Sequence, residues 1–421
     1  MLKKCCAVGA LILAFAAAAN AAAPAGFPFH NGDRVVFLGD SITEQRLYTT
    51  YLETYLLTRF PTWNLQFRNA GWGGDTSWLR QRGLPPDQAL KRDVLDLHPT
   101  VVTIDFSMND AGYGAFNPAL YAQHVHGEQD IVREIKAAGV LPIVLTVSPV
   151  EKHEPGDDMI GYNQVLEQFA AGDQMVAQDA HVPFADQFHP FVAAINRLRA
   201  IDPNTRLSGD VVHPGKAGHL LMADFILTGL NAPPMVSSVV IDAGKDRVNH
   251  TDGAHVTNLA RQNGGISFHR VDDALVFPIE NAARPALQLV PVTDNLDRYL
   301  LTVTHLAPGD YMVSVDGTPV SRYSAAELND GVNLSYYDSP LTAQGDQILK
   351  LVYEKNNDYF DLWRNVQLKP DAQVPDKAAK EADLTAKIAD LEKQINALRQ
   401  PRTYEISVAP VAPMKAPPVT P

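Results

Sequence analysis

The stretch RVVFLGDSIT, residues 34–43, decides the fold. Its apolar run up to Leu38 predicts a buried strand that stops at Gly39, and apolar positions at helical spacing over 44–60 predict a helix directly after it. Continuous apolar runs at 101–104 and 142–145 are typical of central parallel strands, which are covered on both faces. The alternation of strands and helices up to about residue 230 therefore predicts an α/β domain in which helices cover both faces of a parallel sheet.

The size and charge of the chain limit the classes of partner. The chain has 421 residues, of which 46% are apolar, and its formal net charge is −13. This length predicts two or three domains with a large buried core. An acidic balance argues against partners that present phosphates, because nucleic acids and anionic membranes require a basic protein surface. The sequence therefore excludes nucleic acid as the partner.

The first 21 residues have the pattern of a secretory signal peptide. A basic start precedes an apolar run over 5–19, and the small-residue triplet 19–21 supplies a cleavage site, which we place after Ala21. This run is too short for a lasting anchor, so we expect a secreted or periplasmic protein without a stable membrane span. Both cysteines, Cys5 and Cys6, lie in this segment, and we expect a mature chain without disulfides.

The rest of the chain divides into four expected parts. The α/β domain is expected over 27–232, and a smaller β-rich accessory module over 233–370, because short β-branched runs replace the helical pattern there. Leucine and isoleucine at heptad spacing over 384–398 predict a helix at 376–400 that either packs on its own protein or forms a homo-oligomer. The proline-rich segment 401–421 is expected to be disordered.

Polar segments follow the predicted strands, at the edge of the sheet where α/β folds bind their ligands. Ser41 comes directly before the first helix, so its N–H is suited to a developing oxyanion. The second segment, NAGWGGDT at 69–76, contains glycines that leave backbone N–H groups accessible. In the third, SMND at 107–110, Asn109 offers a side-chain amide to the same position.

The fourth segment supplies an acid–base pair. In DVVHP at 210–214, an aspartate three residues before a histidine can bind the Nδ1–H of the ring and leave Nε2 to take a proton from a serine. The segment DQFHP at 186–190 has the same spacing, so spacing alone does not choose between the two pairs. We favour Asp210 and His213, because this pair comes last in the α/β region and opens its final helix.

Together the four segments resemble the SGNH hydrolase superfamily, the GDSL-type esterases and lipases. The resemblance covers residues 30–230 and implies a flavodoxin-like, three-layer α/β/α fold. Carried over by position, it also implies a catalytic triad and an oxyanion hole. Their residues are Ser41, Asp210 and His213 for the triad, and Ser41, Gly74 and Asn109 for the oxyanion hole.

The third segment departs from the family pattern at one position. Ser107 stands where that segment usually has glycine. If the position needs a positive φ, we expect Asn109 to be slightly displaced; if the glycine supplies only close packing, the change is harmless.

The resemblance implies an exported ester hydrolase acting on a small-molecule or polysaccharide ester. A carbohydrate O-deacetylase is the first expectation, with a lysophospholipase or thioesterase-like lipid esterase as the alternative. A non-catalytic binding or scaffold protein is the hypothesis of another class. Trp72, within the second segment, is a candidate for stacking on a sugar ring. No metal or cofactor is expected, because dinucleotide-binding and His-Glu-x-x-His motifs are absent, and His124 and His126 lack companions at metal-ligand spacing.

Overall fold

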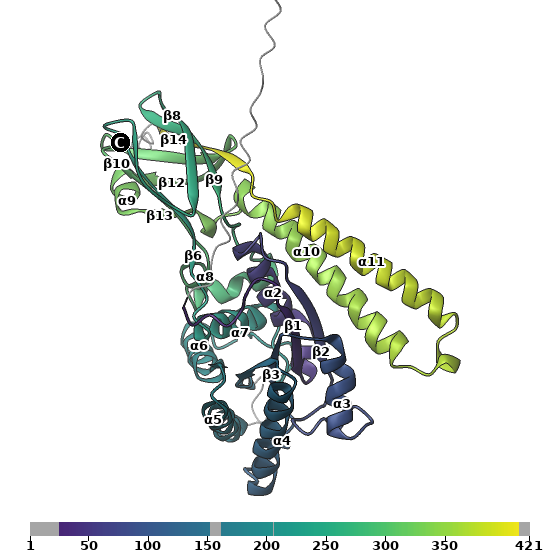
Figure 1. The fold of residues 1–421 in the computed structure, drawn as a ribbon. Coiled ribbons are helices and arrows are strands. Elements are labelled where there is room, and N and C mark those ends of the chain that lie inside the picture. The colour runs from purple at the N-terminus through teal and green to yellow at the C-terminus, as the bar shows by residue number, and fades with distance from the viewer. Residues whose placement is uncertain (1–24, 152–160, 205, 412–421) are drawn as a thin grey trace, which may run out of the picture.

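The computed structural model describes residues 25–151, 161–204 and 206–411 and comprises three parts (Figure 1). These are an α/β lobe (27–232), a β module (235–337 with 403–410) and a helical hairpin (340–398). The predicted signal peptide, 1–21, lies outside the described residues. Of the helices in the described ranges, none combines the length and the apolar character that crossing a bilayer requires.

The α/β lobe is built on a five-stranded parallel sheet in the order β2-β1-β3-β4-β5. Side chains alternate between its two buried faces: Val35 and Phe37 of β1 enter one apolar core, and Val36 and Leu38 enter the other. This confirms the predicted α/β class. The strands are β1 (Arg34–Gly39), β2 (Gln66–Gly71), β3 (Val101–Asp105), β4 (Leu141–Leu145) and β5 (Phe184–Ala185).

Helices cover both faces of this sheet, with α2 and α7 contributing to one core and α3 and α4 to the other. Gly39 at the end of β1 is in register with Gly71 of β2 and Asp105 of β3. The segments that follow these three strands therefore meet at one edge of the sheet. The helices are α1 (Ser41–Glu44), α2 (Leu47–Arg59), α3 (Pro86–Asp93), α4 (Pro118–Ala137), α5 (Tyr162–Ala180), α6 (Phe188–Ile201) and α7 (Lys216–Gly229), with a 3-10 turn at Leu95–Leu97.

The β module contains two sheets that share an apolar core of their own. The first sheet has the order β13-β10-β6-β7 and the second β12-β11-β14-β9-β8. Its strands are β6 (Met235–Asp242), β7 (Arg247–Asp252), β8 (Ala254–Gln262), β9 (Gly265–Asp272), β10 (Arg298–Thr304), β11 (Asp310–Val315), β12 (Thr318–Ser324), β13 (Val332–Asn333) and β14 (Thr403–Pro410). Short helices connect them: Asn281–Gln288, α8 (Val292–Leu296), α9 (Ala325–Asp330) and Leu334–Tyr336.

Strand β14 corrects the prediction that 401–421 is disordered. It pairs with β9 on one side and β11 on the other, so it lies inside the second sheet. Tyr404, Ile406 and Val408 are buried at every second position, which is the pattern of a strand. Two of the six prolines that suggested disorder lie at the two ends of this strand, at 401 and 410, and the other four lie at 413–421. Residues 412–421 lie outside the described ranges.

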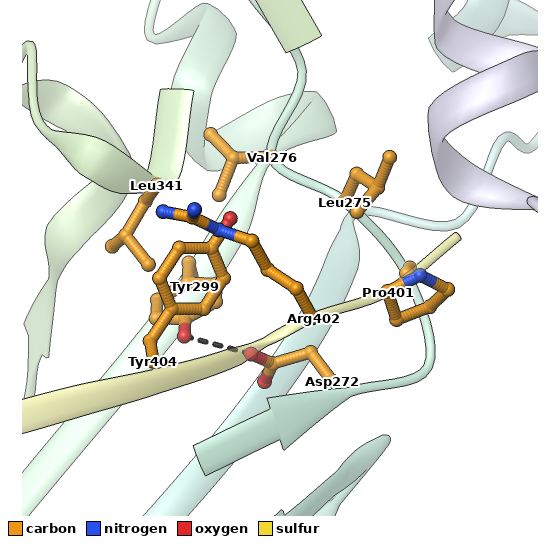
Figure 2. A pocket seen from close by; sticks show the side chains of 9 residues that line it. Asp272, Leu275, Val276, Tyr299, Leu341, Pro401, Arg402 and Tyr404 are labelled. Carbon is orange, nitrogen blue, oxygen red and sulfur yellow. Dashed lines mark hydrogen bonds between the residues drawn. The ribbon is translucent and has the colours of Figure 1, made fainter. Parts of the chain in front are cut away.

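The chain re-enters the β module beside a small cavity (Figure 2). Tyr299, Arg402 and Tyr404 line it, and the Tyr299 hydroxyl donates to Asp272 Oδ2 over 2.7 Å. With about 10 Å³, it has room for roughly one water molecule. It is therefore a packing feature and not a ligand site.

The helical hairpin joins the two other parts. Helix α10 (Pro340–Phe360) continues into a π-helix (Asp361–Gln367), and after a 3-10 turn at Asp371–Gln373 the chain returns as α11 (Lys377–Leu398). Helix α10 packs against α2 of the α/β lobe, and α11 packs on α10. The accessory module expected over 233–370 is therefore wrong at its C-terminal end, because 340–367 leaves the β-sheets and covers the α/β lobe.

The heptad seam of α11 faces its own chain. Ile388, Leu391 and Ile395 are each about 4% exposed or less and join the two cores of the α/β lobe or the contact with α10. The predicted alternative of a helix packed on its own protein is therefore the one observed. The homo-oligomer expected through 384–398 is not supported, because its apolar surface is already occupied.

Candidate active site

Ser41 stands at the junction of β1 and α1, where the sequence predicts it. Asp40 is the N-cap of α1, and its Oδ1 accepts a hydrogen bond from the Ile42 amide over 2.9 Å. Gly39 has no room for a side chain, because a Cβ there would lie 2.2 Å from Thr43 Oγ1 and 2.5 Å from the Asp105 carbonyl. The strand end and the helix cap thus fix the direction in which the serine leaves the sheet.

The structure brings Asp210 and His213 to this serine. His213 Nε2 lies 2.9 Å from Ser41 Oγ, and His213 Nδ1 lies 2.9 Å from Asp210 Oδ2. Asp210 Oδ1 also accepts hydrogen bonds from the amides of Val212 and His213, each over 2.7 Å. Partial burial acts to raise the pKa of Asp210, but these hydrogen bonds outweigh it and hold the pKa below its usual value. The aspartate is therefore ionised and fixes the imidazole beside the serine.

The second aspartate–histidine pair lies elsewhere. His189 Nδ1 contacts Asp186 Oδ2 over 2.7 Å, so this pair has the same internal geometry. Its Nε2, however, faces Glu167 Oε1 at 3.6 Å. Of the two pairs that spacing left open, Asp210 and His213 are the one next to Ser41.

Asn109 connects all three strand-end segments. Its Nδ2 donates to the Asp75 carbonyl over 2.9 Å and to Asp40 Oδ2 over 3.1 Å. Its Oδ1 accepts from the Tyr113 hydroxyl over 2.8 Å, which fixes the orientation of the amide. The side-chain amide therefore lies against Asp40, the residue that precedes Ser41.

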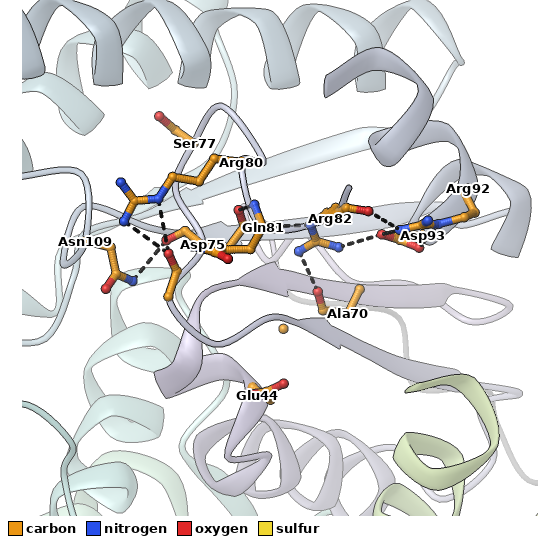
Figure 3. A network of polar contacts seen from close by, with 12 residues as sticks. Glu44, Ala70, Asp75, Ser77, Arg80, Gln81, Arg82, Arg92, Asp93 and Asn109 are labelled. Atoms are coloured by element: carbon orange, nitrogen blue, oxygen red, sulfur yellow. Dashed lines mark hydrogen bonds and ion pairs between the residues drawn. The ribbon is translucent and has the colours of Figure 1, made fainter. Parts of the chain in front are cut away.

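Gly74 lies in the loop that follows β2 and has a φ of 72°, which glycine adopts without strain. The Arg80 guanidinium donates to its carbonyl over 3.3–3.4 Å. Figure 3 shows how this loop is held: Arg82 binds Asp75 over 2.7 Å, Asp93 over 3.1 Å and the Ala70 carbonyl over 2.9 Å, and all three charged side chains are fully buried. Sequence reasoning missed this network, because its members are ordinary charged residues in a loop and a helix.

The buried carboxyl group of Asp40 has an unusually high pKa. Burial, together with the nearby carboxylates of Asp110 and Asp75, raises its pKa to about 8, against the opposing effect of the hydrogen bond from the Ile42 amide. The carboxyl group next to Ser41 is therefore protonated at neutral pH. No negative charge then stands beside Asn109, where an oxyanion would form.

Trp72 does not present a free ring. The guanidinium of Arg364, from the π-helix of the hairpin, lies 3.1 Å from its ring centre, and Trp363 meets it edge-on at 5.9 Å. Arg364 also lies 3.5 Å from Glu44 of α1. One face of Trp72 is thus covered by the chain itself, so the expected sugar-stacking role is not supported.

Ser107 has a φ of 82°, so the position does need the left-handed conformation that glycine favours. Its Oγ donates to Asp173 Oδ2 over 3.2 Å. Asn109 nevertheless reaches both Asp40 and Asp75, so the expected displacement leaves its hydrogen bonds intact.

Asp173 belongs to a buried ionic cluster below the third segment. His124 Nε2 lies 2.7 Å from Asp173, and Nδ1 lies 2.9 Å from Asp110. Burial acts to lower the pKa of His124, but Asp173 and Asp110 outweigh it and raise the pKa well above its usual value. His124, Glu128 and Asp173 bring potential ligand atoms within 4.8 Å of one another, yet both ring nitrogens of His124 already contact carboxylates. These residues fit an ion-pair network.

A serine at the end of the first strand of a parallel α/β sheet, with a histidine beside it, defines a hydrolase class. Residues 37–221 match the GDSL-like Lipase/Acylhydrolase family, which confirms the resemblance read from the four segments. The α/β lobe matches this family model, and the match supports a hydrolase of ester bonds. A search among curated protein sequences gives no match.

Solved structures share the fold at low sequence identity. A gut microbial diltiazem-metabolizing enzyme is 22% identical, covers 91% of this chain and 99% of its own, and has a TM-score of 0.76. The fold of nearly the whole chain, including the β module and hairpin, thus has a counterpart. A catalytic mutant of an acetylxylan esterase from Geobacillus stearothermophilus is also 22% identical and covers 48% of this chain and 95% of its own, with a TM-score of 0.40.

Proposed function

We propose that the protein is a serine ester hydrolase in which Ser41 is the nucleophile and His213 the general base. The observation that carries this proposal is the continuous hydrogen-bonded chain from Ser41 Oγ through His213 to Asp210, with both contacts at 2.9 Å. A serine hydroxyl is a weak nucleophile until a neighbouring base accepts its proton, and an ionised carboxylate on the far nitrogen stabilises the imidazolium that results.

The reaction proceeds in two halves. Ser41 Oγ attacks the ester carbonyl carbon while its proton passes to His213 Nε2, and the carbonyl π electrons move to oxygen as the tetrahedral intermediate forms. Collapse breaks the carbon–oxygen bond of the ester, and the leaving alkoxide takes the proton from Nε2. Water then attacks the acylated serine with His213 again as base, and collapse releases the acid and returns the proton to Ser41.

The oxyanion is stabilised by donors from three segments. The backbone N–H groups of Ser41 and Gly74 and the side-chain amide of Asn109 would donate to it. Asp40 is protonated at neutral pH, so its Oδ2 is a weaker hydrogen-bond acceptor than a negatively charged substrate oxygen. Asn109 Nδ2 can therefore exchange its hydrogen bond to Asp40 for one to the oxyanion.

For the substrate, we propose an O-acetylated carbohydrate outside the cytoplasm. The signal-peptide pattern of residues 1–21 supports export, and a secreted or periplasmic enzyme has access to acetylated polysaccharides outside the cytoplasm. A lipid-type esterase or thioesterase is the alternative, and it should prefer longer acyl chains. A series of p-nitrophenyl esters from acetate to dodecanoate separates the two, since a maximum at acetate supports the deacetylase and a maximum at long chains overturns it. Mass spectrometry of the exported protein tests cleavage after Ala21.

The catalytic assignment is tested by a matched pair of histidine variants. His213→Ala and Ser41→Ala are expected to lose p-nitrophenyl acetate hydrolysis by several orders of magnitude, whereas His189→Ala, which lies in the same Asp-x-x-His-Pro pattern, retains it. A fluorophosphonate should label the wild type and not Ser41→Ala. Wild-type rates in Ser41→Ala would show that Ser41 is not the nucleophile, whereas an inactive and unlabelled wild type would favour the non-catalytic scaffold. Diltiazem belongs in the substrate panel, because the structural neighbour of this whole-chain architecture is named for metabolizing it.

A further inference from the structure

Tyr113 is an exposed aromatic residue fixed against the proposed oxyanion hole. Its side chain is 42% exposed, yet its hydroxyl donates to Asn109 Oδ1 over 2.8 Å. Its ring stacks on Tyr162 at 5.4 Å with an interplanar angle of 17°, and its amide donates to the Tyr162 hydroxyl over 3.1 Å. Its φ of 56° is in the left-handed region, which a bulky side chain adopts only when its surroundings require it. Three contacts thus hold this ring in a strained conformation.

The same ring lines a cavity of about 420 Å³ at the surface. This volume is within the range of roughly 300–1,000 Å³ that small-molecule sites occupy. Phe116, which is 38% exposed, forms a second aromatic wall, and Gln164 and Gln168 of α5 add side-chain amides. Among the residues that the structure describes, none that lines the cavity carries a charged side chain.

This lining suits one class of ligand. The C–H face of a pyranose packs on aromatic rings, while its hydroxyls exchange hydrogen bonds with amides, and neither contact requires charge. An anionic ligand would need a cation, which the described lining residues lack.

We propose that this cavity, bounded by Tyr113, Phe116, Gln164 and Gln168, binds a neutral sugar ring of the ester substrate, and that Tyr113 links this subsite to Asn109. The proposal rests on the function proposed above. Because the Tyr113 hydroxyl occupies Asn109 Oδ1, the amide nitrogen is held toward Asp40, the residue that precedes Ser41. Burial raises the pKa of Tyr113 and the Asp40 charge raises it further, so the phenol stays a donor throughout the working pH range. Tyr113 is a positioning residue for Asn109 and a binding surface for the sugar.

Kinetics on two substrates test the subsite. If the subsite exists, acetylated xylotetraose is long enough to occupy it together with the serine site, whereas p-nitrophenyl acetate is too small to fill both. Phe116→Ala is expected to lower kcat/KM for acetylated xylotetraose about tenfold, through KM, and to change p-nitrophenyl acetate hydrolysis far less. Tyr113→Phe keeps the ring and loses the hydroxyl, so kcat should fall on both substrates with little change in KM. Met175→Ala, an equally exposed residue of α5 remote from the cavity lining, is the control and should match wild type.

Binding without turnover separates failure of the subsite from failure of the proposed function. Calorimetry with xylotetraose and the full-length Ser41→Ala chain should show binding, weakened about tenfold by the added Phe116→Ala change. If p-nitrophenyl acetate hydrolysis depends on Ser41 but xylotetraose does not bind, or if Phe116→Ala lowers both substrates equally, the subsite is refuted while the esterase stands. If hydrolysis persists without Ser41, the assignment of Ser41 as nucleophile, and with it the proposed function, is refuted. Equal thermal unfolding midpoints for all variants exclude misfolding as the cause.

Discussion

Ser107 is the one position where the third segment departs from the family pattern. Substitutions there can separate the energy of its backbone strain from the energy of its hydrogen bond to Asp173. Its φ of 82° costs a residue with a side chain roughly 1–2 kcal/mol. Its hydrogen bond to the buried Asp173 carboxylate, at 3.2 Å, contributes about 1.5–3 kcal/mol, as bonds to charged groups do. Ser107→Ala loses the bond and keeps the strain, so we expect the free energy of unfolding to fall by about 1.5–3 kcal/mol. Ser107→Gly loses the same bond but relieves the strain, and should be more stable than Ser107→Ala by about 1–2 kcal/mol.

Urea unfolding at neutral pH, followed by tryptophan fluorescence and far-UV circular dichroism, measures both differences on the same three proteins. Coincident transitions by the two probes are needed before the free energies are compared. A Ser107→Ala variant as stable as wild type would show that the bond to Asp173 contributes nothing. Equal stability of the alanine and glycine variants would show that the left-handed backbone carries no strain, and either result refutes the reasoning.

Two further predictions concern buried charges. The folded protein keeps the Asp40 proton up to about pH 8, whereas the unfolded chain releases it near 3.8, so the free energy of unfolding should fall as the pH rises between these values. Hydrolysis of p-nitrophenyl acetate should also decline above about pH 8, because the Asp40 carboxylate then forms beside Asn109. Asp40→Asn should flatten the pH dependence of both stability and activity. If the two pH dependences stay the same in this variant, Asp40 is not the group that titrates. Lys355→Met should lower the urea-unfolding free energy by about 3–5 kcal/mol, because it leaves Glu53 buried without its cation, and Glu53→Gln should recover much of this in the double variant. A loss of under about 1 kcal/mol would show that the pair is not needed.

The strands and the polar segments were predictable because their signals are local. The apolar run before Gly39 and the residues that follow it specify a strand, a turn and a helix within ten positions. For Trp72 the sequence was uninformative, because a tryptophan beside glycines looks the same whether its ring is open or covered, and Arg364, which covers one face, comes from the other end of the chain. Tyr113 was missed for a related reason: an aromatic between two glycines directly after the third segment was a usable signal, but its contact with Asn109 depends on the fold of the loop.

The order of elements in the C-terminal half links the β module to the helical hairpin. After α7 the chain builds most of the β module, leaves it for the hairpin, and returns as β14 between β9 and β11. The second sheet is therefore complete only once the hairpin has formed.

The hairpin in turn depends on contacts with the α/β lobe. Asn356 of α10 donates to Thr50 and Glu53 of α2. Arg399 at the end of α11 donates to the Trp63 carbonyl. Neither part can be removed without exposing apolar surface and leaving buried polar groups of the other without partners. Since the tip of this hairpin also carries the guanidinium that covers Trp72, the accessory half supports the loop that holds Gly74. The hairpin is therefore part of the framework that supports the candidate active site.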